Sequence, residues 1–225
     1  MKLVHPLFGE PIRFGENSIQ VLTVENPVMF RTLVFELTEQ AESKEGRFVL
    51  SVNDRLLDCA GHLQVVGDYA HLSAPDKRLQ TKLFTALLRH AQETMAEETF
   101  RLSAQLQEYL GKLAALADYP VAYEQSENLL PLLKAMEFRV DLEDLPPHET
   151  LYEYLSLLDR LLKDQCFVLV QAKTYFSEQE LLQLYSMAQY RKWNLLLLEA
   201  HAAPRRLEGE VHRLYDADLC ELLDP

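Results

Sequence analysis

Apolar and polar positions along the chain recur with the two periods of a mixed α/β protein. Two short alternating stretches within residues 12–25 flank a turn signal at residues 15–17, and this pattern predicts a hairpin that leads into a strand. Asn26 and Pro27 suit the N-cap and the first position of a helix, which we expect to reach about Gln40. The stretches FVLSV and HLQVVGDY predict two further strands.

The middle of the chain is predominantly helical. Residues 76–116 contain no proline and a single glycine, and as one helix they would span roughly 60 Å. A compact domain does not need such a helix, so we expect a bend or a break near residues 97–99. A row of large apolar side chains recurs at spacings of four, three, four and three, which predicts a seam packed against another helix. The row consists of Leu102, Leu106, Tyr109, Leu113 and Leu116.

After a second helix at residues 126–136, the pattern returns to alternating strands and helices. FRVDL and CFVLVQA predict strands on either side of a helix at residues 150–164. Ser177 and Glu180 form a capping box for a helix that runs to about Trp193, and NLLLLEA predicts a buried, parallel strand. VHRLY predicts a last strand before a final turn of helix. We therefore expect an α/β head of residues 1–75 and 137–225, with an all-helical domain of residues 76–136 inserted into it.

Composition narrows the class of protein. With 225 residues, 48% of them apolar, the chain can bury a real core, and its formal charge of −13 argues against broad, nonspecific binding of nucleic acids. Cys59, Cys166 and Cys220 lie far apart and lack zinc or redox spacing, which favours a reduced, cytoplasmic setting. The first eight residues are too short and too broken by Pro6 for a signal peptide, and no stretch is long enough to cross a membrane.

Signatures of catalysis are missing from the sequence. The turn at residues 24–29 has no glycine and no lysine, so it cannot form a phosphate-binding loop. No histidine pair has zinc-hydrolase spacing, and no G-x-S-x-G motif occurs. We expect the protein not to be an enzyme and not to bind a nucleotide. The alternative is an α/β nucleotide-binding or small-molecule-binding protein, or an enzyme, with a site near Lys173 and Glu199 at two strand ends. Glu199 is also consistent with a solvated strand end.

Basic side chains gather on the predicted helical domain. Arg78, Lys82 and Arg89 fall within one narrow stripe of a helix, where they would track a phosphate backbone or form an ordinary solvated face. Lys134 and Arg139 flank the return of the chain to the head.

Acidic side chains gather where the helical domain meets the head. Calcium takes six to eight oxygen ligands in flexible geometry, and this acidic cluster would supply several of them or simply face solvent. The cluster includes Asp118, Glu124, Glu127 and Asp141.

The order of these elements resembles the Csn-two family, the small CRISPR-associated adaptation proteins of type II-A systems. The resemblance covers nearly the whole chain and is carried by VLTVENPVMF, by the helical insertion that contains Lys82, and by the tail CFVLVQAKTYFSEQELLQLY followed by NLLLLEA. It implies a degenerate P-loop-ATPase-like head without ATPase activity, helical legs, and calcium at the hinge. It also implies a homotetrameric ring that threads double-stranded DNA ends through a basic channel during spacer acquisition, alongside the integrase proteins and the effector nuclease.

Within the resemblance, Lys82 is the residue transferred from the family, whereas Arg78, Arg89, Lys134 and Arg139 follow from the stripe and the hinge. The chain has Tyr119-Pro120-Val121-Ala122 where relatives have a denser run of acids, so we expect fewer or weaker calcium sites. A third hypothesis is a protein-interaction scaffold that uses the apolar row from Leu102 to Leu116 as its partner surface.

Overall fold

The structure is a computed structural model of the whole chain, and it describes residues 1–72, 77–123, 129–142 and 145–222, without the side chains of residues 77 and 78. The chain separates into two compact units, Met1–Leu72 with Leu142–Pro225, and Ser73–Asp141. The first unit is a mixed α/β structure, and the regular elements described in the second are all helices.

A six-stranded sheet forms the centre of the α/β unit, with the order β10-β9-β3-β8-β7-β6. Its strands are β3 (Ile19–Val24), β6 (Leu63–Val66), β7 (Cys166–Val170), β8 (Asn194–Glu199), β9 (Glu210–Tyr215) and β10 (Glu221–Leu222). All neighbouring pairs are parallel except β9 with β10. Strand β8 lies between β3 and β7, and five of its six residues are buried, as its continuous apolar pattern predicts.

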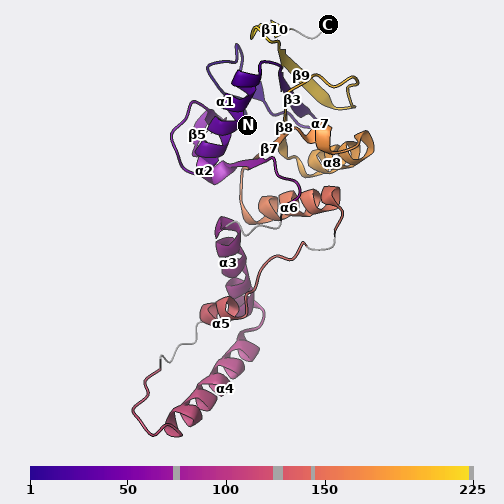
Figure 1. Cartoon of the computed structure of the whole chain (residues 1–225). Helices are drawn as coiled ribbons and strands as arrows, with labels where there is room; N and C mark the ends of the chain where they lie inside the picture. The colour runs from indigo at the N-terminus through magenta and orange to yellow at the C-terminus, as the bar shows by residue number, and fades with distance from the viewer. Residues whose placement is uncertain (73–76, 124–128, 143–144, 223–225) are drawn as a thin grey trace. The chain divides into compact units, whose positions relative to one another are not determined.

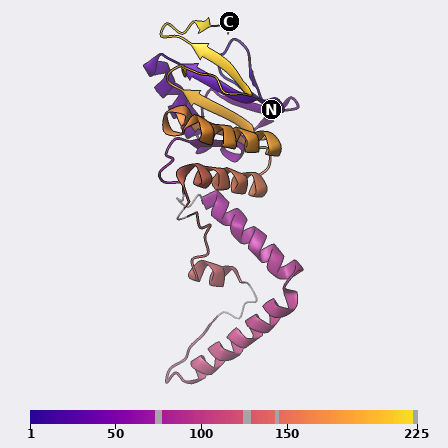
Figure 2. The same ribbon diagram turned by 90° about the vertical axis from the view of Figure 1, so that its right-hand side faces the viewer.

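Helices cover both faces of this sheet (Figures 1 and 2). Helix α1 (Pro27–Ala41) lies on one face, while α6 (Pro147–Leu161) and α8 (Glu178–Arg191) lie on the other. Two short helices, α2 (Cys59–His62) and α7 (Ala172–Tyr175), complete the unit. The expected helix starts are confirmed, since Asn26 accepts hydrogen bonds from two amides of α1 and the Ser177/Glu180 capping box begins α8.

A small antiparallel sheet of order β2-β1-β4-β5 joins the same core. Its strands are β1 (Lys2–Val4), β2 (Ile12–Arg13), β4 (Val49–Val52) and β5 (Arg55–Leu57). The buried Gln40 side chain of α1 holds Phe48, the residue just before β4. Gln40 Nε2 donates a hydrogen bond to the Phe48 carbonyl over 2.9 Å, and Gln40 Oε1 accepts one from the Phe48 amide over 2.8 Å. The sheet places Leu3, Ile12 and Leu50 on its inner face, where all three are buried.

The expected hairpin around residues 15–17 is wrong, because the two strands that flank this turn belong to different sheets. Strand β2 pairs with β1, whereas β3 pairs with β8 and β9. The local sequence specifies the turn, but the choice of strand partner depends on β1 and β8, which are distant along the chain.

Two other expected elements differ from the structure. FRVDL forms no strand: residues 138–142 belong to neither described sheet, and residues 138–141 lie within the helical unit. The last described residues form β10 in place of a turn of helix, because residues 221 and 222 pair with the end of β9.

The helical unit contains α3 (Lys77–Glu93), α4 (Ala96–Ala115) and α5 (Leu130–Ala135). The long helix is broken at Thr94 and Met95, slightly before the expected position, and the Thr99 hydroxyl of α4 donates to the Ala91 carbonyl of α3 across the break, over 3.3 Å. Helix α5 begins at Leu130, and the predicted start at residue 126 lies outside the described residues. Both α4 and α5 contact α3.

Candidate functional site

Two cations of the predicted stripe, Lys82 and Arg89, lie on α3 with exposed side chains. Leu79 and Phe84 of the same helix are buried. No carboxylate in the described part of the chain forms an ion pair with either cation, so both keep their charge available for an outside anion. Arg78 belongs to the same helix, but its side chain lies outside the described part.

The second pair of predicted cations lies at the other end of the helical unit's sequence. Lys134 is an exposed residue in the last turn of α5, and Arg139 is exposed a few residues later. The Gln80 side chain of α3 donates a hydrogen bond to the Phe138 carbonyl, which brings the segment next to Arg139 alongside the first half of α3. The chain therefore places cations from α3 and from the α5 segment in one small helical unit.

The predicted calcium ligands are only partly within the described residues. Asp118 and Asp141 are exposed carboxylates of the helical unit, whereas Glu124 and Glu127 lie outside the described residues. Across the residues that are described, no three His, Cys, Asp or Glu side chains are placed to hold a metal ion. The calcium site thus stays a prediction that depends on all four carboxylates.

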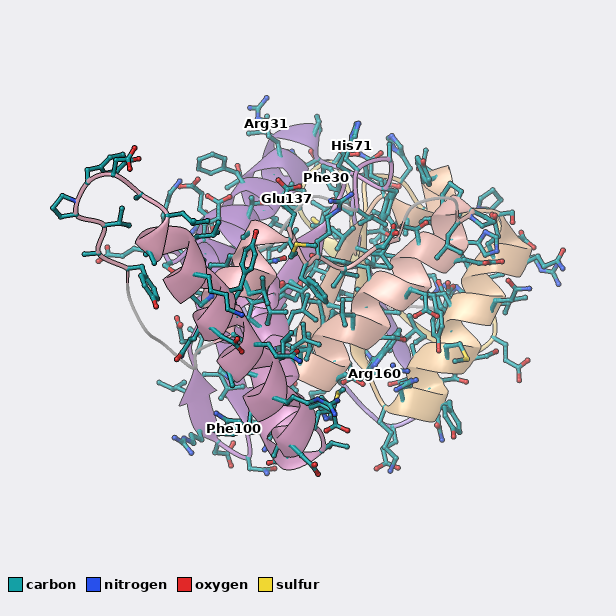
Figure 3. The ribbon with its side chains drawn as sticks, turned by 90° about the horizontal axis from the view of Figure 1, so that it is seen from below. Phe30, Arg31, His71, Phe100, Glu137 and Arg160 are labelled. Atoms are coloured by element: carbon teal, nitrogen blue, oxygen red, sulfur yellow. The ribbon has the colours of Figure 1, made fainter. Side chains whose placement is uncertain are left out.

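The apolar row on α4 is about half exposed within the described part of the chain. We call Leu102, Leu106, Tyr109 and Leu113 the α4 stripe; these side chains are 41–59% exposed. The only buried residue of the twenty in α4 is Ser103. Figure 3 shows the side chains of this helix with Phe100 labelled, and Phe100 adds a further exposed ring outside the stripe. The sequence predicted a seam against another helix, and the structure leaves that seam open.

The alternative site near Lys173 and Glu199 is a closed, internally paired cluster. The Lys173 ammonium lies 2.6 Å from Oε1 and 2.8 Å from Oε2 of Glu210, whose side chain is fully buried. Glu210 also accepts hydrogen bonds from the Tyr185 hydroxyl and the Leu207 amide, and it contacts His212 Nε2 at 2.8 Å. Every oxygen of this carboxylate is therefore occupied, and the lysine is not free to bind a ligand.

Glu199 is buried, so its interpretation as a solvated strand end is wrong. It is 3% exposed, and one of its oxygens accepts a hydrogen bond from the Lys173 amide over 3.0 Å. Burial raises the pKa of Glu199 to about 7, because a charged carboxylate loses its water there. Burial alone would also raise the pKa of Glu210, but the hydrogen bonds from His212, Lys173 and Tyr185 hold it at about 2.

Sequence reasoning missed Glu210, Tyr185 and His212 as parts of this cluster. They come from β9 and α8, and no spacing in the sequence connects them to Lys173 at the start of α7. Only the parallel pairing of β9 with β3 and the packing of α8 on the sheet bring them together. The contacts of Lys173 and Glu210 connect α7, α8, β8 and β9 to one another.

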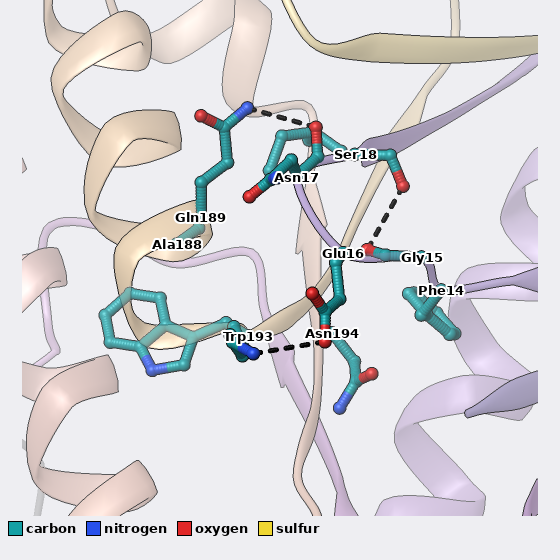
Figure 4. Close-up of a pocket in the computed structure, with 11 residues that line it drawn as sticks. Phe14, Gly15, Glu16, Asn17, Ser18, Ala188, Gln189, Trp193 and Asn194 are labelled. Carbon is teal, nitrogen blue, oxygen red and sulfur yellow. Dashed lines mark hydrogen bonds and ion pairs between the residues drawn. The ribbon is translucent and has the colours of Figure 1, made fainter.

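A cavity of about 190 Å³ lies at the amino ends of β3 and β8 (Figure 4). The turn before β3 and the end of α8 line it, and their polar groups pair with one another. Lys192 Nζ lies 3.1 Å from Glu16 Oε1, and the Gln189 amide donates to the Asn17 carbonyl over 3.3 Å. This end of a parallel sheet is opposite to the carboxyl ends where such folds bind ligands, so we assign the cavity no ligand.

Among the helices of the described residues, none combines the length and the apolar character that crossing a membrane requires. A comparison with models of protein families matches residues 40–219 to the family described as CRISPR-associated protein (Cas_Csn2). The match extends over both the α/β unit and the helical unit.

Proposed function

Because the chain belongs to the Cas_Csn2 family of CRISPR-associated proteins, we propose that it binds double-stranded DNA ends during spacer acquisition, without catalysis of its own. The observation that carries this proposal is the pair of exposed cations Lys82 and Arg89 on α3, for which the described residues offer no ion-pair partner. DNA binding depends mainly on the local neutralisation of phosphates, so a few such side chains are sufficient for contact.

A ring resolves the conflict between a charge of −13 and binding of a polyanion. Four copies that direct their α3 cations inward would present a positive channel, while most carboxylates would face the solvent. The exposed α4 stripe supports assembly, since monomeric proteins rarely leave so continuous a row of large apolar side chains in water. In the proposed ring, this stripe lies between copies.

The α/β unit is proposed to be a degenerate P-loop-like head that supports the ring without binding a nucleotide. The turn before α1 supports this, because it contains Glu25 and Pro27 where a phosphate loop needs backbone amides and a lysine. Calcium is proposed to bind the hinge through Asp118, Glu124, Glu127 and Asp141, where it would neutralise carboxylates that otherwise repel one another. The integrase proteins and the effector nuclease are the proposed partners in the cytoplasm.

The test compares gel shifts of linear and relaxed closed-circular duplexes of one sequence at low salt, with calcium or with EDTA. The oligomer mass is measured in parallel. We expect a tetramer that shifts linear DNA only, and more strongly with calcium. Equal shifts of both DNA forms would indicate an open surface groove, and a monomer that shifts neither form would favour the interaction-scaffold function of the α4 stripe.

A further inference from the structure

A groove on the α/β unit lies between the first half of α6 and residues 180–187 of α8. It has a volume of about 200 Å³ and is lined by His148, Glu149, Tyr152, Glu180, Gln183, Leu184 and Met187. Pockets for drug-sized ligands usually measure about 300–1,000 Å³. A groove of this size accommodates a single side chain of a partner better than a free metabolite.

The floor of the groove is apolar. Leu184 is 6% exposed, and Tyr152 packs against the buried Trp193 with 6.1 Å between ring centroids. Met187 completes this surface from the next turn of α8. Such a floor binds the aliphatic stem of a long side chain and offers the face of an aromatic ring to a cation.

The rim of the groove is acidic. Glu149 of α6 and Glu180 of α8 line it, with side chains 54% and 34% exposed. In the capping box, Glu180 Oε2 accepts hydrogen bonds from the Ser177 amide over 2.8 Å and from the Ser177 hydroxyl over 2.7 Å. Glu180 Oε1 lies 3.1 Å from His148 Nδ1. Glu149 lies 3.9 Å from His148 Nε2, so its carboxylate keeps most of its capacity to accept hydrogen bonds.

The same geometry argues against a metal ion. The two carboxylates approach opposite nitrogens of the His148 ring, so one ion cannot be bound by all three side chains at once. The imidazole is the only group on the lining that can carry a positive charge. An apolar floor below two carboxylates complements an arginine or lysine side chain, in which an aliphatic stem carries a cationic head.

We propose that this groove is a docking site for a basic side chain, arginine or lysine, presented by an exposed segment of a protein partner. The acidic character of the whole chain would attract such a segment from a distance. This site is independent of the α3 cations, so DNA binding and docking can fail separately.

The experiment uses the full chain with ¹³C-labelled methionine methyl groups. The chain has five methionines, of which Met187 lines the groove, and the other four serve as internal references. The probe is the acetylated, amidated tripeptide Arg-Leu-Arg, and its neutral counterpart carries citrulline in place of both arginines. We expect the Met187 signal to move saturably with the arginine peptide and to respond roughly threefold to tenfold more weakly to the citrulline peptide.

Variants identify the groove as the site. E149Q/E180Q should weaken binding of the arginine peptide by a similar factor. E149Q alone should weaken this binding in part, and this variant leaves the capping box of α8 intact. The matched control E97Q/E98Q removes two exposed carboxylates of α4 and should change nothing at Met187. Gel shifts of linear DNA should be unaffected by E149Q/E180Q.

Four results would overturn the proposal. One is an unmoved Met187 signal, and another is equal binding of the two peptides. The third is a loss in E97Q/E98Q as large as in E149Q/E180Q, which would mean attraction to bulk charge. A Met187 signal that moves on dilution of the protein alone would assign the groove to a second copy of the chain and would also contradict the proposal.

Discussion

The Lys173 ammonium lies 2.6 Å from the Glu210 carboxylate, and both side chains are almost completely withdrawn from water. The pair connects the start of α7 to the start of β9, which lie 37 positions apart in the sequence. Lys173, which the sequence places at a strand end as a candidate ligand-binding lysine, is instead paired with Glu210 inside the α/β unit.

We predict that K173A destabilises the α/β unit by about 3–5 kcal/mol, since it leaves Glu210 buried without its cation. The double variant K173M/E210Q should be much closer to the wild type, because neither remaining group carries a charge. Chemical denaturation followed by the fluorescence of Trp193, the only tryptophan, measures both free energies of unfolding. A loss below about 1 kcal/mol in K173A would show that the pair contributes little.

A second prediction concerns the pH dependence contributed by Glu199. Its pKa is about 7 in the folded chain and near 4.5 in the unfolded chain, so between these values the folded state holds one proton more. The contribution of Glu199 to stability therefore falls as the pH rises from 4.5 to 7. The total loss is on the order of 3 kcal/mol, since each pKa unit corresponds to about 1.4 kcal/mol.

E199Q keeps an oxygen that accepts the Lys173 amide hydrogen but cannot ionise. We expect the difference in unfolding free energy between E199Q and the wild type to grow in favour of the variant as the pH rises through this range. Parallel denaturation curves at pH 5, 6, 7 and 8 measure it. A difference that does not change with pH would contradict the raised pKa.

The DNA proposal predicts the effect of reversing two charges on α3. K82E/R89E should reduce binding of linear DNA at least tenfold and should flatten its dependence on salt, because two phosphate contacts are lost per copy. The matched control R160E/K163E reverses two exposed cations at the end of α6, where Figure 3 labels Arg160. A folded K82E/R89E protein that binds as tightly as the control would refute the site assignment.

The α4 stripe predicts the basis of assembly. L106E/L113E places two carboxylates on this exposed row and should reduce the mass of the oligomer while the helical content stays constant. Sedimentation velocity and circular dichroism check both points. The control F35E/L56E alters two exposed apolar side chains of the α/β unit and should leave the mass unchanged. Retention of the full oligomer by L106E/L113E would place the contact elsewhere.

Local signals predicted most of the regular elements of the α/β unit. The Asn26 cap, the Ser177/Glu180 capping box and the apolar run of β8 depend on residues close in sequence, and the structure confirms all three. The strand predicted at residues 138–142 failed for the opposite reason. Its apolar residues are typical of a strand, but a strand also requires a partner, and residues 138–141 lie in the helical unit, whose described residues belong to neither sheet.

Some features of the candidate sites likewise follow from the local sequence, and others depend on tertiary packing. The sequence alone determined that Lys82 and Arg89 share one side of a helix and that α4 carries an apolar row, because both follow from helical periodicity. Only the tertiary structure decided that the row stays about half exposed among the described residues, that Glu199 is buried, and that Lys173 is bound by Glu210. Burial and pairing depend on which distant segments meet, and that choice is made by the parallel sheet and its covering helices, which local patterns do not encode.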